Sequence, residues 1–123
     1  MQQQMILVAG PYRSGTNDDP VLIEANVKQM TKASLSVYRR GHIPMMGEWV
    51  ALPLIEEAGS REMGDDIFNE IFHPIAANLI NFCDAVVRIG GPSSGADYML
   101  QVAREKGKSV YMSLEEIPEF KSL

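Results

Sequence analysis

The segment MILVAGPYRSGT, residues 5–16, decides the fold of this chain. Met5–Ala9 is a short apolar run, which is typical of a strand buried on both faces of a parallel sheet. The run ends directly in a Gly-rich loop, residues 10–16. Asp19 and Pro20 then provide an N-cap and a first-turn proline, so a helix is expected to begin there. A strand, a Gly-rich loop and a helix in this order indicate the first unit of an α/β fold.

Strands and helices alternate along the rest of the chain. Residues 20–40 have apolar side chains at helical spacing and end in basic residues before Gly41, which is typical of a helix C-terminus. In the apolar run that follows, Pro44 removes one ladder hydrogen bond, so that strand is expected at a sheet edge. The expected strands are residues 5–9, 42–46, 84–89 and 109–112, and the expected helices are residues 20–40, 49–58, 65–82 and 97–106.

Two further signals refine these boundaries. Pro74 predicts a kink or a break near His73, because proline removes a helical hydrogen bond and clashes with the preceding turn. Ser113–Glu116 matches a capping box that opens a short C-terminal helix.

This order of elements predicts the fold class. Alternating strands and helices imply right-handed crossovers and a parallel sheet covered on both faces. We expect one α/β domain over residues 1–123, a small doubly wound parallel sheet of four to five strands with helices on both faces. This is a Rossmann-like or flavodoxin-like three-layer sandwich. In such sheets, ligands bind beyond the carboxyl ends of the strands, where the strand order reverses.

The composition excludes several classes of function. A net charge of −5 and a pI of about 4.9 argue against a nucleic-acid polymer as partner, because such binding needs a basic face. One cysteine, Cys83, and two histidines, His42 and His73, make neither a disulfide nor a metal site. No cofactor is implied. The N-terminal MQQQ is unlike a signal peptide and no apolar run is long enough to span a membrane, so a cytoplasmic protein is expected.

The first Gly-rich loop is a candidate anion site. It lacks the lysine of a Walker A motif, so P-loop ATP hydrolysis is rejected. Arg13 can fork two hydrogen bonds onto a phosphate, and Tyr12 can stack on a base or sugar. The alternative is that Tyr12 packs in the protein and Arg13 pairs with Asp18 or Asp19. The candidate binding residues here are Gly10, Pro11, Tyr12, Arg13, Ser14 and Gly15.

The second Gly-rich loop, residues 90–96, follows another apolar strand. Two serine hydroxyls at the start of a helix, Ser93 and Ser94, can form a phosphate-binding site together with the free N–H groups of the first turn. The alternative is simple N-capping by Ser94, with one serine capping while the other binds. Asp97 is favoured in the first turn by the helix dipole alone and is also a candidate catalytic acid. The candidate binding residues here are Gly91, Ser93, Ser94 and Gly95.

Glu48 is the main candidate for a reacting carboxylate. It follows the second strand next to Trp49, which brings it to the same sheet edge as the two loops. The alternative is a helix-initiating acid beside a core tryptophan. His42 and Asp84 lie at the opposite edge and are interpreted as structural, and His73 has no evident partner. The candidate catalytic residues are therefore Glu48, Tyr12 and Asp97.

Several of these segments resemble the nucleoside 2-deoxyribosyltransferase family. They are G-P-Y-R-S-G, R-R-G-H, C-D-A-V-V and S-S-G-A-D-Y-M-L-Q-V-A-R-E-K-G-K-S-V. The chain is most similar to the small bacterial members and to the 2′-deoxynucleoside 5′-monophosphate N-glycosidase branch. The resemblance implies a pocket for a deoxyribonucleoside or its monophosphate and a homo-oligomer. It also implies a carboxylate nucleophile that attacks C1′ and forms a glycosyl-enzyme intermediate.

The chain departs from that family at both acidic positions. The glutamate eight residues before the glycine of G-K is Met99 here, and the family's second acid is replaced by Ala76. Three explanations follow: another carboxylate reacts, Glu48 before Asp97; the chain binds a nucleotide without glycosyl transfer; or the pocket serves unrelated chemistry. The competing functions are N-glycosidic cleavage or transfer, a nucleotide-binding or sensing module, and a purely structural or partner-binding protein.

Overall fold

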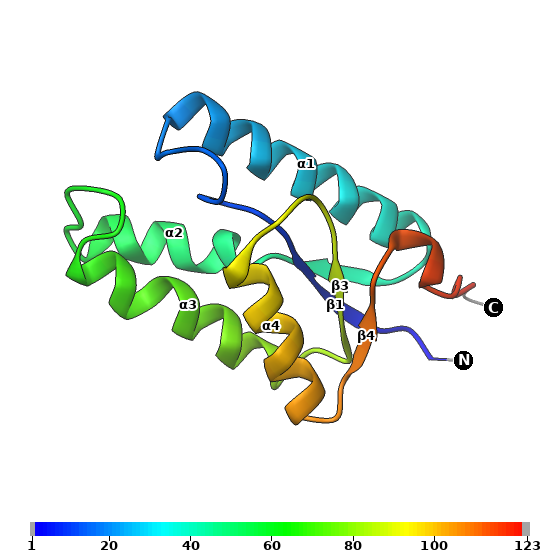
Figure 1. The fold of residues 1–123 in the computed structure, drawn as a ribbon. Helices are drawn as coiled ribbons and strands as arrows, with labels where there is room; N and C mark the ends of the chain where they lie inside the picture. The colour runs from blue at the N-terminus through cyan, green and yellow to red at the C-terminus, as the bar shows by residue number, and fades with distance from the viewer. Residues whose placement is uncertain (1, 122–123) are drawn as a thin grey trace.

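A computed structural model describes residues 2–121 of the chain. Its elements alternate as the sequence pattern predicts, and Figure 1 shows their arrangement. In chain order they are β1 (Met5–Ala9), α1 (Pro20–Arg39), β2 (Ile43–Met45), α2 (Gly47–Glu57), α3 (Asp66–Ile80), β3 (Ala85–Arg88), α4 (Ser94–Glu105), β4 (Ser109–Tyr111) and the 3₁₀ turn η1 (Leu114–Glu116).

The sheet has four parallel strands in the order β2-β1-β3-β4, which confirms the predicted α/β fold class. No fifth strand occurs within residues 2–121. β1 lies inside the sheet and pairs with β2 on one side and β3 on the other. β2 is an edge strand, as Pro44 predicts, and Pro44 pairs with Ile6 there. An edge tolerates proline because one side of the strand needs no ladder partner.

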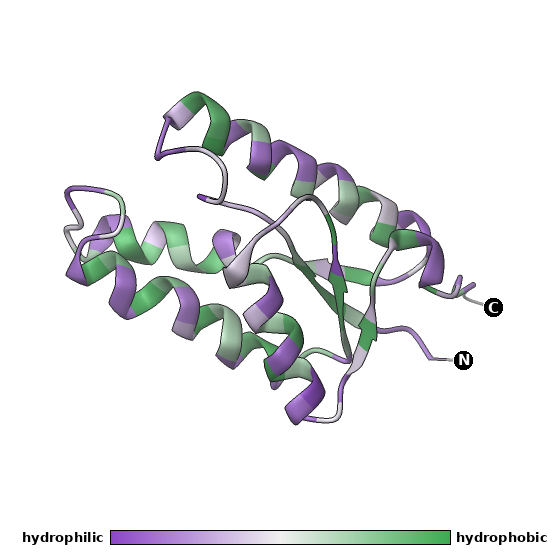
Figure 2. Cartoon of the chain, in the orientation of Figure 1, coloured by the Kyte–Doolittle hydropathy of each residue, from purple (hydrophilic) through white to green (hydrophobic). Residues whose placement is uncertain are grey.

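Helices cover both faces of this sheet (Figure 1). One apolar cluster joins Ile6, Val8 and Val87 of the sheet to Met30 and Val37 of α1. Alternate strand residues point to the other face, where a second cluster contains the sheet and the inner sides of α3 and α4; its members include Leu7, Val86, Ile80, Leu100 and Ala103. Figure 2 shows apolar residues along the strands and polar residues along the outer side of α1. The three-layer sandwich therefore has its core on both faces of one sheet.

α1 has the predicted start and end. The Asp19 carboxylate accepts a hydrogen bond from the Val21 N–H at 2.9 Å, which is the expected N-cap. Gly41 adopts a φ of +95°, the left-handed conformation of the residue after a helix C-terminus. A side chain there would also collide with the Phe120 carbonyl oxygen. α1 therefore begins and ends where the sequence predicts.

The predicted break at Pro74 and two of the predicted helix starts are wrong. α3 runs through Pro74 without a break, because side chains on both sides of it, such as Phe68 and Ile75, pack into the same core cluster. α2 begins at Gly47 rather than Trp49, and Gly47 has no Cβ to collide with Ala76 of α3. α4 begins at Ser94 rather than Asp97, because Ser93 caps it.

The predicted C-terminal helix is only the three-residue turn η1. Ser113 makes no side-chain cap there, and the Glu116 carboxylate instead accepts a hydrogen bond from the Met112 N–H at 3.1 Å. The glutamate of the predicted capping box therefore accepts a backbone hydrogen bond, but from Met112 rather than from the expected Ser113. Within the part of the chain that the structure describes, no helix is long and apolar enough to cross a membrane.

Candidate functional site

The strand order reverses between β1 and β3. From β1 the chain first goes through α1 to β2 on one side, and it later reaches β3 on the other side. At such a reversal the connections after the two strands diverge and leave a crevice at the carboxyl edge of the sheet. Both Gly-rich loops lie at this crevice, the first after β1 and the second after β3. The topology thus brings both loops to the sheet edge at which the sequence predicts a ligand site.

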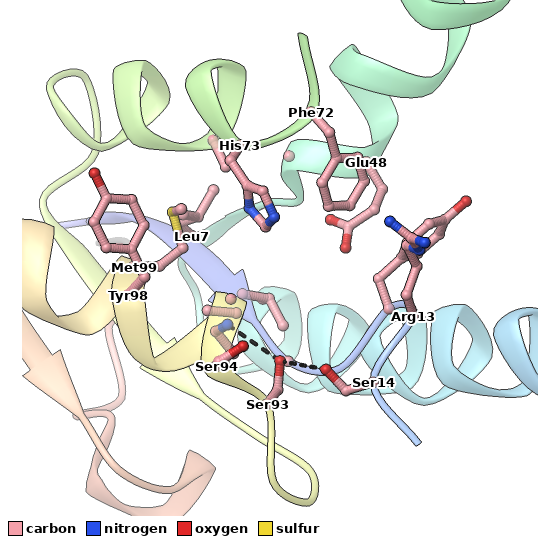
Figure 3. A pocket seen from close by; sticks show the side chains of 18 of the residues that line it. Leu7, Arg13, Ser14, Glu48, Phe72, His73, Ser93, Ser94, Tyr98 and Met99 are labelled. Atoms are coloured by element: carbon pink, nitrogen blue, oxygen red, sulfur yellow. Dashed lines mark hydrogen bonds between the residues drawn. The ribbon is translucent and has the colours of Figure 1, made fainter. Parts of the chain in front are cut away.

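A pocket of about 630 Å³ occupies this crevice (Figure 3). That volume is typical of small-molecule sites. The two loops and the start of α4 form one side, and α2 and α3 form the other. Its polar and charged lining residues are Tyr12, Arg13, Ser14, Asn17, Asp18, Glu48, His73, Ser93, Ser94 and Tyr98.

The serines gather at the N-terminus of α4. The Ser93 hydroxyl accepts a hydrogen bond from the Ala96 N–H at 3.2 Å, and the Ser14 hydroxyl donates to it at 3.0 Å. Ser93 is therefore the N-cap, which corrects the alternative that gave this role to Ser94. The N–H groups of Ser94 and Gly95 lie in the first turn, where a helix provides no internal acceptors. This end of the pocket presents hydroxyls, free N–H groups and a positive helix dipole to an anion.

Glu48 is the buried acid of the pocket. It lies in the first turn of α2 with 9% of its surface exposed, and Figure 3 shows its carboxylate pointing into the pocket. Among residues 2–121 its only hydrogen bond is with its own backbone N–H. Burial raises the pKa of Glu48 from its ordinary value of 4.5 to about 7, because the charged form loses its water. At neutral pH this side chain is present in both its acid and its carboxylate form.

Tyr12 is mainly a packing residue. It is buried, and its ring lies 4.9 Å from the Phe72 ring and 6.5 Å from the Phe68 ring, measured between centroids. Burial raises the pKa of the Tyr12 phenol, and the negative charge of Glu48 raises it further. Its backbone carbonyl accepts a hydrogen bond from Asn26 at 2.9 Å. The side chain lines the pocket from within this aromatic cluster.

Arg13 forms the ion pair that was the alternative to phosphate binding. Its Nε and Nη2 donate to the two carboxylate oxygens of Asp18 at 2.8 and 2.9 Å. Its guanidinium also lies 5.5 Å from the centroid of the Phe68 ring and close to Gly64. The hydrogen bond from Arg13 lowers the pKa of Asp18. A ligand anion must therefore compete with Asp18 for this arginine.

His73 is one of the pocket residues that sequence reasoning missed, together with Asn17 and Tyr98. It comes from α3, and its ring lies over Gly95, where a Cβ would be 2.9 Å from Cε1 of the imidazole. Burial lowers the pKa of His73, and the positive charge of Arg13 lowers it further. The sequence around His73 contains no signal for its neighbour Gly95, because α3 and α4 come together only in the folded chain.

The two positions where the family resemblance expects carboxylates line the pocket as well. Met99 and Ala76 lie there with Leu7, and they make this part of the wall apolar. The expected positions are therefore at the site, while the expected charges are missing.

Four predicted residues do not line the pocket. Pro11 packs against Gly90, and Gly15 has open space around its Cα. Gly91 turns its carbonyl to Arg88, whose Nη2 donates to it at 2.7 Å.

Asp97 is the fourth, and it pairs with Arg88 at 3.0 Å on the far side of the loop, at a separate shallow hollow. The helix starts three residues earlier than predicted, so Asp97 closes its first turn rather than opening the helix.

The residues interpreted as structural have structural partners. The buried His42 accepts a hydrogen bond from the Gln4 N–H at 3.0 Å and contacts the Pro118 carbonyl at 2.6 Å. Asp84 accepts a hydrogen bond from the Met5 N–H at 2.8 Å. Trp49 is 45% exposed, so its interpretation as a core residue is wrong.

No protein-family model matches this chain, and no curated protein sequence matches it either. Within residues 2–121, no three His, Cys, Asp or Glu side chains are grouped as metal ligands would be. The geometry combines a pocket of small-molecule size, a helix N-terminus with free N–H groups and a buried titratable acid.

Proposed function

We propose that this protein binds a 2′-deoxynucleoside or its 5′-monophosphate in the pocket and breaks the N-glycosidic bond. The observation that carries the proposal is Glu48, a buried carboxyl that pairs with no other described side chain and points into a pocket with a helix N-terminus at one end. A protein pays a high energetic cost to bury such a group, and that cost is typical of functional sites. The resemblance to nucleoside 2-deoxyribosyltransferases supports the same chemistry.

The phosphate of the nucleotide binds at the N-terminus of α4. The N–H groups of Ser94 and Gly95 and the hydroxyls of Ser93 and Ser94 donate to its oxygens. The Ser93 hydroxyl accepts from Ala96 and Ser14, so its own proton remains available to the ligand. The sugar then lies between this phosphate site and α2, where Glu48 points into the pocket.

Glu48 acts in its protonated form as the acid. As the C1′–N bond breaks, its electron pair goes to the base nitrogen, and the Glu48 carboxyl donates its proton to the base. Water forms the new C1′–O bond and loses a proton, so the products are the free base and deoxyribose 5-phosphate. A pKa of about 7 suits this role, because a general acid works best with a pKa near the working pH.

The test is release of free base from each of the four 2′-deoxynucleoside 5′-monophosphates, followed by liquid chromatography. We expect release by the natural protein and a loss of at least about 100-fold in Glu48→Gln, which has the same shape without the proton. Glu56→Gln is the matched control, because Glu56 is exposed on the same helix. No release from any nucleotide contradicts the enzymatic proposal.

The second candidate is a nucleotide-binding or sensing module without turnover. The apolar side chains at Met99 and Ala76 favour it, because neither can act as the nucleophile that the resemblance implies. This candidate predicts that a deoxynucleoside monophosphate raises the melting temperature while no base is released. The melting temperature of Ser93→Ala is then expected to respond less to the same ligand.

A further inference from the structure

His73 is, after Glu48, the second titratable side chain that points into the pocket without a side-chain partner among the described residues. Figure 3 shows its ring directed into the pocket from α3. Its ring lies close to Gly95 and makes an edge-on contact with the neighbouring Phe72 ring, 5.1 Å between centroids. Among the described residues, neither ring nitrogen makes a hydrogen bond, so both are available to water or ligand.

The fold brings His73 and Glu48 to the same part of the pocket. Gly47 precedes Glu48 and packs so closely on Ala76 that a Cβ at Gly47 would lie 3.0 Å from the Ala76 Cβ. Ala76 is three residues after His73, so the two share one face of α3. α2 and α3 therefore meet within one helical turn of both titratable groups.

We propose that His73 accepts the proton of the attacking water while Glu48 protonates the leaving base. This inference rests on the proposed N-glycosidic cleavage and assigns its second proton transfer. The water oxygen bonds to C1′ and its proton goes to a nitrogen of His73, while the C1′–N electron pair goes to the base. After product release, the proton passes from the imidazolium to the Glu48 carboxylate, directly or through water, which restores both groups.

The protonation states of the empty pocket suit these roles. The reaction needs a neutral His73 and a protonated Glu48 at the same time. With the ordinary pKa values of the two residues, at most about 1% of molecules hold that combination at any pH. Burial and the charge of Arg13 lower the pKa of His73, whereas burial raises that of Glu48 to about 7. Both shifts therefore raise the share of molecules that hold the required pair.

The charge of Arg13 acts in the same sense as burial, because it also lowers the pKa of His73. The ion pair with Asp18 holds the Arg13 guanidinium in place. The titratable and charged groups that line the pocket are Tyr12, Arg13, Asp18, Glu48, His73 and Tyr98.

The pH dependence of kcat for base release tests the inference. We expect a bell-shaped profile for the natural protein, with the acidic limb set by His73 and the alkaline limb by Glu48. His73→Gln is expected to lower kcat about 100-fold, to change KM little and to remove the acidic limb. Asn78→Ala, an exposed change on the same helix, is the control and is expected to match the natural protein.

Rescue separates a chemical role from a structural one. Because His73 is exposed, His73→Ala is expected to fold. Added imidazole is expected to raise the rate of base release by this variant at least tenfold. If the natural protein releases base but His73→Gln keeps its rate and its acidic limb, this inference is overturned and the proposed function stands. If the natural protein releases no base, both are overturned.

Discussion

Replacing Glu48 by glutamine is expected to stabilise the protein, and the gain depends on pH. The pKa of Glu48 rises from 4.5 to about 7 on folding, so the folded chain holds this proton more tightly than the unfolded chain does. Its ionisation therefore lowers the free energy of unfolding as pH rises from about 4.5 to about 7, and the loss is complete above that range. Glutamine carries no charge at any of these pH values and avoids the loss.

The size of the effect follows from the pKa difference. The two pKa values differ by about 2.5, and each pKa unit corresponds to about 1.4 kcal/mol, so ionised Glu48 lowers the free energy of unfolding at pH 8 by about 3 kcal/mol. For a domain of this length, that is about 12 °C in Tm. At pH 4.5 the same variant is expected to differ from the natural protein by less than about 0.5 kcal/mol, because Glu48 is then neutral in the folded chain and only about half ionised in the unfolded chain.

Urea unfolding at pH 4.5 and pH 8 measures both numbers. Glu56→Gln is the control for changes in net charge, since Glu56 lies exposed on α2. An equal stability of Glu48→Gln and the natural protein at pH 8 would refute the reasoning, because the carboxylate would then be as well solvated in the pocket as in water. A stability gain of the same size at both pH values would also refute it.

Four further substitutions test the residues that surround the pocket. Ser93→Ala removes the cap of α4 and is expected to cost about 1 kcal/mol in urea unfolding, whereas Ser94→Ala is expected to cost less than about 0.5 kcal/mol. Arg88→Gln frees the second loop, because the buried Arg88 bonds to the Ile89 and Gly91 carbonyls and to Asp97; we expect a loss of about 2 kcal/mol, measured in the same way. Gly95→Ala pushes a Cβ against the His73 ring, so kcat for base release is expected to fall roughly tenfold while Tm changes little; an unchanged kcat would contradict the assigned place of the ring.

Much of the fold was predictable because its signals are local. The apolar run Met5–Ala9 and the cap at Asp19 each act through neighbours in the sequence, and the structure has both where they were expected. Pro74 shows the limit of local signals, since packing on both sides of it outweighs the hydrogen bond that it removes. The cap of α4 was misassigned because Ser93 and Ser94 are equally good caps by residue type.

The pocket was predictable only in outline. The Gly-rich loops and Glu48 follow strands, so the topology alone brings them to one edge. His73 lies inside a helix, and its place over Gly95 depends on how α3 crosses α4. Asp97 was misplaced for a local reason, because the helix starts three residues earlier than predicted and the side chain pairs with Arg88 of β3. A contact between helices distant in the sequence decides the place of His73.

The central claim is that a nucleotide binds with its phosphate at the N-terminus of α4 and its sugar toward Glu48. Backbone amide chemical shifts during titration with a 2′-deoxynucleoside 5′-monophosphate test it most directly. The largest shifts are predicted at the amides of Ser94 and Gly95, with smaller ones at Ser14 and Glu48, and they are expected to be weaker with the unphosphorylated nucleoside. No shift at saturating nucleotide, or shifts confined to residues outside the pocket, would contradict the claim.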